Sequence, residues 1–223
     1  ITALAAGTAS LSMGGGNDTV NFVATWTGAD SYDGGDGVDT LGVAAALSNA
    51  GASSTVFGGL SNVEVLAVST EVAVTLESNT GFSIIDISDA ADQTVNLNDG
   101  YTQATTIKLG SDVTDNINNN ANVDLTVQTN SGGFTASTDI VGSTGTNDVL
   151  NIVNAADGDT IFDTNNDVFE TINLVPFSAT ADPTITLTGY SLALGTGVVT
   201  INAAGLGAGN VVTLVGNASA TPI

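Results

Sequence analysis

Apolar and polar residues alternate along this chain in short runs, each about six residues long. The alternation has the period of two that turns one face of a β-strand toward a core. Val, Ile and Thr, which favour strands, are frequent in the runs, and Gly, Asn, Asp and Ser separate them. The pattern predicts strands in residues 18–24, 63–68, 72–78, 83–88, 93–98, 105–110, 123–128, 148–153, 170–175, 184–189, 198–203 and 211–216.

Helix-forming patterns are scarce, because Lys occurs once, Arg is absent and Glu is rare. Only residues 38–51, "VDTLGVAAALSNAG", favour a helical turn. The predicted strands begin at nearly regular intervals of roughly a dozen residues, as in a solenoid whose coils stack on one another. The sequence therefore predicts an all-β parallel β-solenoid, of the β-roll or β-helix kind. A β-sandwich, which also has regularly spaced short strands, is the alternative.

Two parts of the chain share one rhythm of motifs. Asp39 in "GVDTL" precedes Glu64 in "NVEVLAV" by 25 residues, and Asp148 in "TNDVLNI" precedes Glu170 in "VFETINLV" by 22. We interpret residues 1–113 as a first solenoid half and residues 135–223 as a second, related half. The Asn-rich residues 114–134 would form connecting coils between them. Glu64 and Glu170 lie inside strand patterns, and a structural bond to the amides of a neighbouring turn is more plausible for them than metal binding.

The charge balance restricts the partners. The chain carries 23 acidic residues against one basic residue, Lys108, and its net charge is −22. Nucleic acids and anionic lipid surfaces attract Lys and Arg, so neither is an expected partner. No run approaches the roughly 18 apolar residues of a membrane span. Repulsion among the acids opposes a compact fold unless counter-ions bind.

The available metal ligands are all oxygens. The chain has no His and no Cys, so zinc, copper and haem lack their usual ligands. Carboxylate, amide and carbonyl oxygens favour calcium first and magnesium second. Calcium is therefore the predicted cofactor.

Two segments of the chain combine several glycines with aspartate in the same order. Residues 34–42, "GGDGVDTLG", follow the pattern G-G-x-G-x-D-x-L-x, in which the glycines permit positive φ and the acids supply negative charge. Residues 13–21, "MGGGNDTVN", depart from the pattern only at its first glycine. Asp18 and Asp39 are 21 residues apart, about one coil, so stacking would place the two turns one above the other. An ordinary Asp-Gly hairpin loop is the alternative for each turn.

These segments resemble the RTX nonapeptide, the calcium-binding turn of parallel β-rolls. The resemblance implies that carbonyl oxygens of the turn and the aspartates Asp18 and Asp39 hold a calcium ion between the stacked turns. The predicted metal site comprises Gly14, Gly16, Asp18, Gly34, Asp36 and Asp39.

A third segment, "STGTNDVLN" (143–151), keeps the aspartate of the pattern but has lost most of its glycines. Its Asp148, together with Asp157 and Asp159 from the acidic segment that follows, forms a second candidate metal site. Local Asx-turns, in which the same side chains bond their own backbone, are an equal alternative.

The wider pattern also resembles S-layer proteins and other type I-secreted surface proteins of Gram-negative bacteria, in the motifs of residues 13–42, 61–68 and 143–174. This implies a secreted structural module on the cell surface that self-assembles with copies of itself, with cell-surface polysaccharide as a further candidate partner. The alternative is a calcium-dependent adhesin or passenger domain, which a surface cluster of Trp26, Tyr32, Tyr101 and Tyr190 would favour.

Catalysis is not expected. Paired carboxylates alone can hydrolyse a glycoside, but sugar-binding grooves usually carry aromatic platforms, and aromatic residues make up 5% of this chain. A calcium-dependent lyase would need a base, and Lys108 is the single basic residue. The start, "ITALAAGTAS", has neither Met nor a charged leader, so we expect a mature or excised piece of a longer protein.

Overall fold

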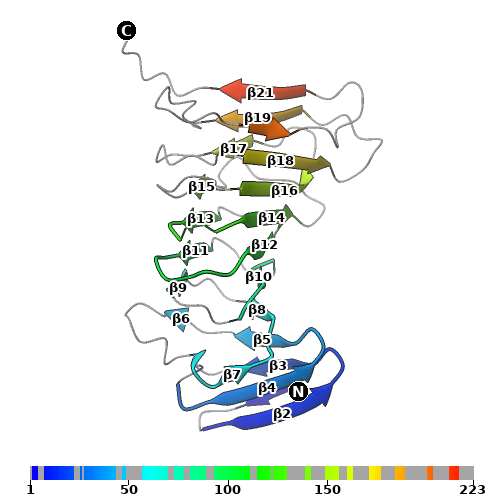
Figure 1. Cartoon of the computed structure of the whole chain (residues 1–223), viewed down its shortest axis with the longest axis vertical. Coiled ribbons are helices and arrows are strands. Elements are labelled where there is room, and N and C mark those ends of the chain that lie inside the picture. The colour runs from blue at the N-terminus through cyan, green and yellow to red at the C-terminus, as the bar shows by residue number, and fades with distance from the viewer. Residues whose placement is uncertain are drawn as a thin grey trace.

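The computed structural model shows parallel strands stacked along one axis as a β-solenoid, which confirms the predicted fold class (Figure 1). It describes residues 2–4, 8–22, 26, 28–43, 47–48, 57–69, 73–77, 81–88, 93–110, 115–121, 123–129, 139–141, 149–155, 160–162, 171–176, 184–188, 200–202 and 211–215. Beyond Val141 it describes the path of the strands but few side chains. No helix in these ranges is long and apolar enough to cross a bilayer.

Three parallel sheets form the sides of the solenoid in the described residues. The largest contains β1 (Thr2–Leu4), β3 (Thr19–Phe22), β5 (Thr40–Val43), β8 (Val65–Val68), β10 (Ile84–Asp86), β12 (Thr105–Leu109), β14 (Leu125–Thr129), β16 (Val149–Ala155), β18 (Thr171–Pro176) and β20 (Thr200–Asn202). The second contains β6 (Leu47–Ser48), β9 (Ala73–Leu76), β11 (Thr94–Leu97), β13 (Asn116–Asn119), β15 (Asp139–Val141), β17 (Thr160–Phe162), β19 (Thr184–Thr188) and β21 (Val211–Val215). The third, near the N-terminus, contains β2 (Ser10–Gly15), β4 (Ser31–Asp36) and β7 (Leu60–Ser61).

Each strand run predicted from alternation coincides with an observed strand. The prediction missed β1, β2, β4, β7, β13, β15 and β17. The Gly-rich β2 and β4 lack apolar alternation and are extended because each pairs with the next coil. The prediction also gave residues 38–51 a helical turn, which is wrong for the described part, where β5 and β6 are extended. Leu41 and Val43 of β5 are both buried, and this burial overrides local helix preference.

Aliphatic side chains stack in a continuous column inside the largest sheet. Register pairing places the same interior position of each coil directly over the last, in the series Val20, Leu41, Leu66, Ile85, Ile107 and Val127. All of these side chains are fully buried. A similar column, Val74, Val95, Ile117 and Ile140, comes from the second sheet. Burial of this apolar surface is the main driving force for stacking the coils.

Asparagine rows run along the outer faces, which explains the Asn-rich composition. In the second sheet, Asn118 Nδ2 donates to Asn96 Oδ1 at 2.7 Å, and Asn96 Nδ2 donates to Thr75 Oγ1 at 3.2 Å. In the largest sheet, Asn173 and Asn151 repeat the first of these bonds at 2.7 Å. Each amide both donates and accepts, so the row links neighbouring coils without adding charge.

Both long sheets continue through the Asn-rich residues 114–134. Strand β13 pairs with β11 and β15, and β14 pairs with β12 and β16. The described residues of this segment, 115–121 and 123–129, therefore form coils of the same kind as their neighbours.

The interior column gives a first prediction. Ile85→Ala should lower the free energy of unfolding by about 2–5 kcal/mol, because it leaves a cavity under a fully buried position. The matched control is Ile84→Ala in the same strand, whose side chain is half-buried on the outer side and should cost clearly less. Urea unfolding of both variants checks this; equal losses would contradict the assignment of the two faces.

Candidate functional site

The Gly- and Asp-rich segments form corners between the third sheet and the largest sheet. We call Gly16–Asp18 the first corner, Gly37–Asp39 the second corner and Asn62–Glu64 the third corner; each connects one strand to the next. The first two corners stack as their 21-residue spacing predicted, since Gly14 pairs with Gly35 before the corner and Thr19 with Thr40 after it.

Glycine is required where these two corners approach each other. Gly14, Gly16 and Gly35 have φ of 108°, 112° and 94°, as predicted for this motif. A Cβ on Gly35 would clash with the carbonyl oxygen of Gly14, and a Cβ on Gly37 would clash with that of Gly16. The carbonyls of the first corner therefore point at the glycines of the next coil.

Acidic side chains at the corners reach back one coil and accept main-chain hydrogen bonds. Asp39 Oδ1 accepts the N–H of Asp18 at 2.7 Å, and Glu64 Oε2 accepts the N–H of Asp39 at 2.9 Å. The structural role predicted for Glu64 is confirmed. The same bond recurs at Asp30, which accepts Ala9 N–H at 2.9 Å, and at Asp115, which accepts Gln93 N–H at 3.0 Å. In a chain with almost no basic residues, these carboxylates accept main-chain hydrogen bonds.

Further hydrogen bonds occupy the gap between the first and second corners. Gly16 N–H donates to Asp36 O at 2.7 Å, and Val38 N–H donates to Asn17 Oδ1 at 3.0 Å. One oxygen of the Asp39 carboxylate is therefore already bonded on the side that faces the first corner.

The other oxygen of Asp39 has no partner. The Asp39 side chain is fully buried, and its Oδ2 makes no hydrogen bond. Oδ2 lies 2.5 Å from the point where a Cβ on Gly34 would be, and the carbonyl oxygen of Asn62 lies even closer to that point. Two acceptor oxygens from neighbouring coils thus lie over one buried glycine, and Asp39 Oδ2 has no donor.

The third coil has this effect because it crosses from the third sheet to the largest sheet in fewer residues than the second coil does. Asp33 pairs with Ser61, and Thr40 pairs with Val65, so the third coil uses three residues fewer between the same register positions. Asn62 makes the tighter turn with a φ of 51°, the left-handed conformation that Asn tolerates better than most residues.

Tyr32 shares this acidic environment. Its side chain is fully buried, and its hydroxyl lies 3.5 Å from the carbonyl oxygen of Asp18. Burial, followed by the negative charges of Asp39, Asp18 and Glu64, raises the pKa of Tyr32 to about 12. The three carboxylates of successive corners therefore act on one buried group.

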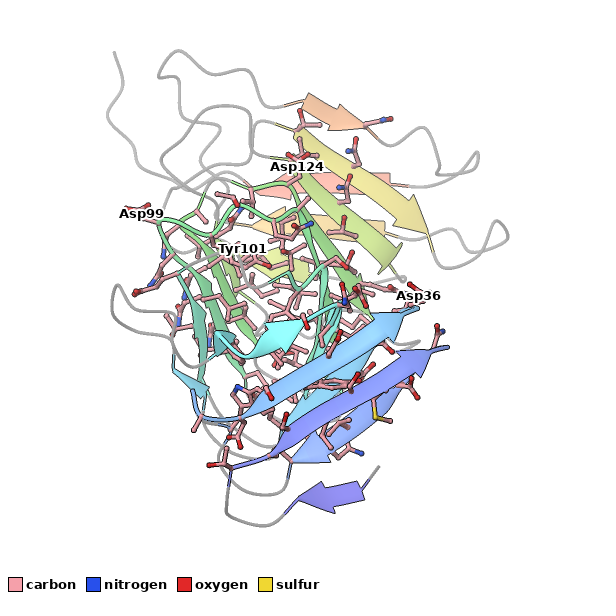
Figure 2. All side chains as sticks on the ribbon, turned by 60° about the horizontal axis from the view of Figure 1, so that its bottom comes forward. Asp36, Asp99, Tyr101 and Asp124 are labelled. Carbon is pink, nitrogen blue, oxygen red and sulfur yellow. The ribbon has the colours of Figure 1, made fainter. Side chains whose placement is uncertain are left out.

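The predicted site residues divide by burial. Gly34 and Asp39 are buried, Asp18 is half-buried, and Gly14, Gly16 and Asp36 are exposed. Figure 2 shows Asp36 at the outer end of β4. The second candidate site, with Asp148, Asp157 and Asp159, lies outside the described residues, as does Glu170.

The sequence-based site omitted Asn62 and Tyr32. The only signal for Asn62 was an Asn before "VEVL", because its role depends on φ and on the shortened turn. Tyr32 had been considered only as a surface aromatic residue. No three carboxylates among the described residues converge closely enough to hold a metal by themselves, so an ion would need carbonyl oxygens as well.

An open depression lies on another side of the solenoid, lined by Glu77, Asn98, Asp99 and Asn120. Asn120 Nδ2 donates to Asn98 Oδ1 at 3.3 Å, and Asn98 Nδ2 donates to Glu77 Oε1 at 3.4 Å. Figure 2 shows Asp99 across the molecule from Asp36. The depression continues the outer asparagine rows and adds no further chemistry.

Comparison of the chain with protein families, with curated proteins and with solved structures finds no match.

The close packing of Asn62 O and Asp39 against Gly34 gives a second prediction. Gly34→Ala should destabilise the fold by about 1–3 kcal/mol, because the added methyl group would overlap Asn62 O and Asp39. Gly15→Ala is the matched control, since a Cβ there meets nothing within 4 Å and the change should stay within about 0.5 kcal/mol. Urea unfolding measures both free energies. Equal losses would mean that Asn62 and Asp39 do not pack closely against Gly34.

Proposed function

We propose that this chain is a structural, calcium-binding module of a secreted bacterial surface-layer protein that assembles with copies of itself. The observation that carries the proposal is the series of acidic residues Asp18, Asp39 and Glu64 on successive corners, in which the buried Oδ2 of Asp39 lacks a donor. In a chain of net charge −22, such a series calls for cations from the surroundings. The likeness of the corner motif to the RTX nonapeptide supports calcium as that cation.

Calcium would act on stability and on assembly. Bound at the corners, it would neutralise acids of adjacent coils and tie those coils together. Extracellular calcium sites commonly work at about 10⁻⁴–10⁻³ M, the range available outside a cell. Between copies, it would offset the repulsion of two surfaces that carry the same negative charge.

The adhesin alternative has less support from the described residues. Trp26, Tyr32 and Tyr101 are all buried, so they cannot form the aromatic surface that would favour sugar binding. Trp26 packs edge-on against Phe22 with ring centroids 4.7 Å apart, and the Tyr101 hydroxyl donates to Phe82 O at 2.9 Å. Tyr190 lies outside the described residues.

Calcium should raise the melting temperature. One site filled at 100 times its Kd stabilises by about 2.7 kcal/mol, which corresponds to about 5–10 °C for a chain of this size. Melts in calcium and in EGTA, each at the same ionic strength set with sodium chloride, measure the difference. Identical curves would contradict calcium binding, and an equal gain from sodium chloride alone would indicate simple screening.

Assembly should require a divalent ion. Light scattering should rise in millimolar calcium and stay low in EGTA, because like-charged copies repel without cations between them. Sodium chloride of matched ionic strength is the control. Ready assembly in calcium-free buffer would contradict the proposed role of the ion.

A further inference from the structure

The buried oxygen of Asp39 faces the third corner, whereas the predicted ion lay between the first two. The other oxygen of the same carboxylate, Oδ1, accepts the N–H of Asp18 in the first corner. We infer that a calcium ion binds between the second and third corners, held by Asp39 Oδ2 and the main-chain carbonyl of Asn62. This inference rests on the calcium binding of the proposed function, and it relocates the ion by one coil.

The convergence of oxygens is the first argument. A buried carboxylate oxygen without a partner is costly, and a second acceptor beside it adds repulsion. A cation between Asp39 Oδ2 and Asn62 O would remove both costs. Gly34 leaves the two oxygens exposed to each other, because any Cβ there would fill the space.

The choice of Asp over Asn is the second argument. At position 39 a donor, Asp18 N–H, lies on one side and an acceptor, Asn62 O, on the other. An asparagine would satisfy both with its own oxygen and amide. The chain uses that solution at the buried Asn119, whose Nδ2 donates to Val123 O at 2.7 Å and whose Oδ1 accepts Val123 N–H at 3.5 Å. A carboxylate in place of an amide at position 39 indicates a positive partner.

The surrounding charges are the third argument. Glu64 bonds the Asp39 amide and adds a second carboxylate to the same corner. Lys108, the single basic residue of the chain, pairs with Asp86 at 3.7 Å on another part of the sheet. The cation must therefore come from solution, and an oxygen-only ligand set with carbonyl and carboxylate donors suits calcium. Asn62 is exposed, so water can complete the coordination shell.

The decisive experiment replaces the carboxylate with an amide and measures thermal stability with and without calcium. In EGTA, Asp39→Asn should melt at or above the wild-type temperature, because its amide can donate to Asn62 O. In calcium, the wild type should gain stability and Asp39→Asn should not, so that the order of the two proteins reverses. Asp124→Asn is the matched control: it removes the same charge from an exposed position away from the corners and should keep the calcium gain.

Terbium, which replaces calcium and luminesces when a nearby aromatic side chain is excited, gives a readout independent of stability. Wild-type protein should show saturable Tb³⁺ emission that calcium displaces, and Asp39→Asn should lose it. Tyr32→Phe should lower the emission excited through aromatic side chains, while direct excitation of Tb³⁺ should show that the ion still binds.

The outcomes separate this inference from the proposed function. An equal calcium gain in the wild type and in Asp39→Asn would overturn the site at Asp39 and leave calcium binding intact. No calcium gain and no Tb³⁺ binding in the wild type would overturn both. A wild type that ignores calcium but gains stability over Asp39→Asn in acid would identify a proton between Asp39 and Asn62, and would also overturn the inference.

Discussion

The fold depends on one constraint: every main-chain amide that a coil turns toward its neighbour must find an acceptor there. On the flat sides, parallel strand pairing supplies the acceptors. At the corners, where the chain changes direction, side chains take over, and Asp30, Asp39, Glu64 and Asp115 each accept an amide of the preceding coil. The acids are therefore part of the stacking itself, and the stacking in turn aligns the aliphatic columns that form the core.

This use of acids makes charge a structural cost. Hydrogen bonds to a carboxylate are stronger than those to a neutral acceptor, which suits a corner that must hold two coils in register. Successive coils bring these acidic residues close together, however, and their negative charge adds to burial in raising the pKa of Tyr32. Outer asparagine rows link the same coils without charge, as between Asn96 and Asn118. Two kinds of contact thus link the coils, carboxylates that accept main-chain amides at the corners and neutral amides along the outer faces.

Much of the architecture could be predicted from the sequence because its signals are local or strictly periodic. Alternation located twelve of the observed strands, and the spacing of Asp18 and Asp39 predicted the stacking of their turns. The Gly-rich strands β2 and β4 were not predicted, because pairing with the next coil, and not their own composition, keeps them extended. The neighbourhood of Asp39 Oδ2 was not predicted because it depends on the third coil, which uses three residues fewer between the same register positions and turns at Asn62. No motif of the second coil contains that information.

The early turn of the third coil also explains the arrangement of acceptors at Asp39. The first two coils have the same number of residues between their register positions. Main-chain N–H groups of one coil therefore face acceptor oxygens of the other and form hydrogen bonds. When the third coil turns early, it brings the carbonyl of Asn62, an acceptor, over the buried carboxylate of Asp39. The mismatch cannot relax by rotation of the Asp39 side chain, since Oδ1 is fixed by Asp18 N–H and the side chain is fully buried. The smaller number of residues between these register positions therefore leaves a buried carboxylate oxygen without a donor at this corner.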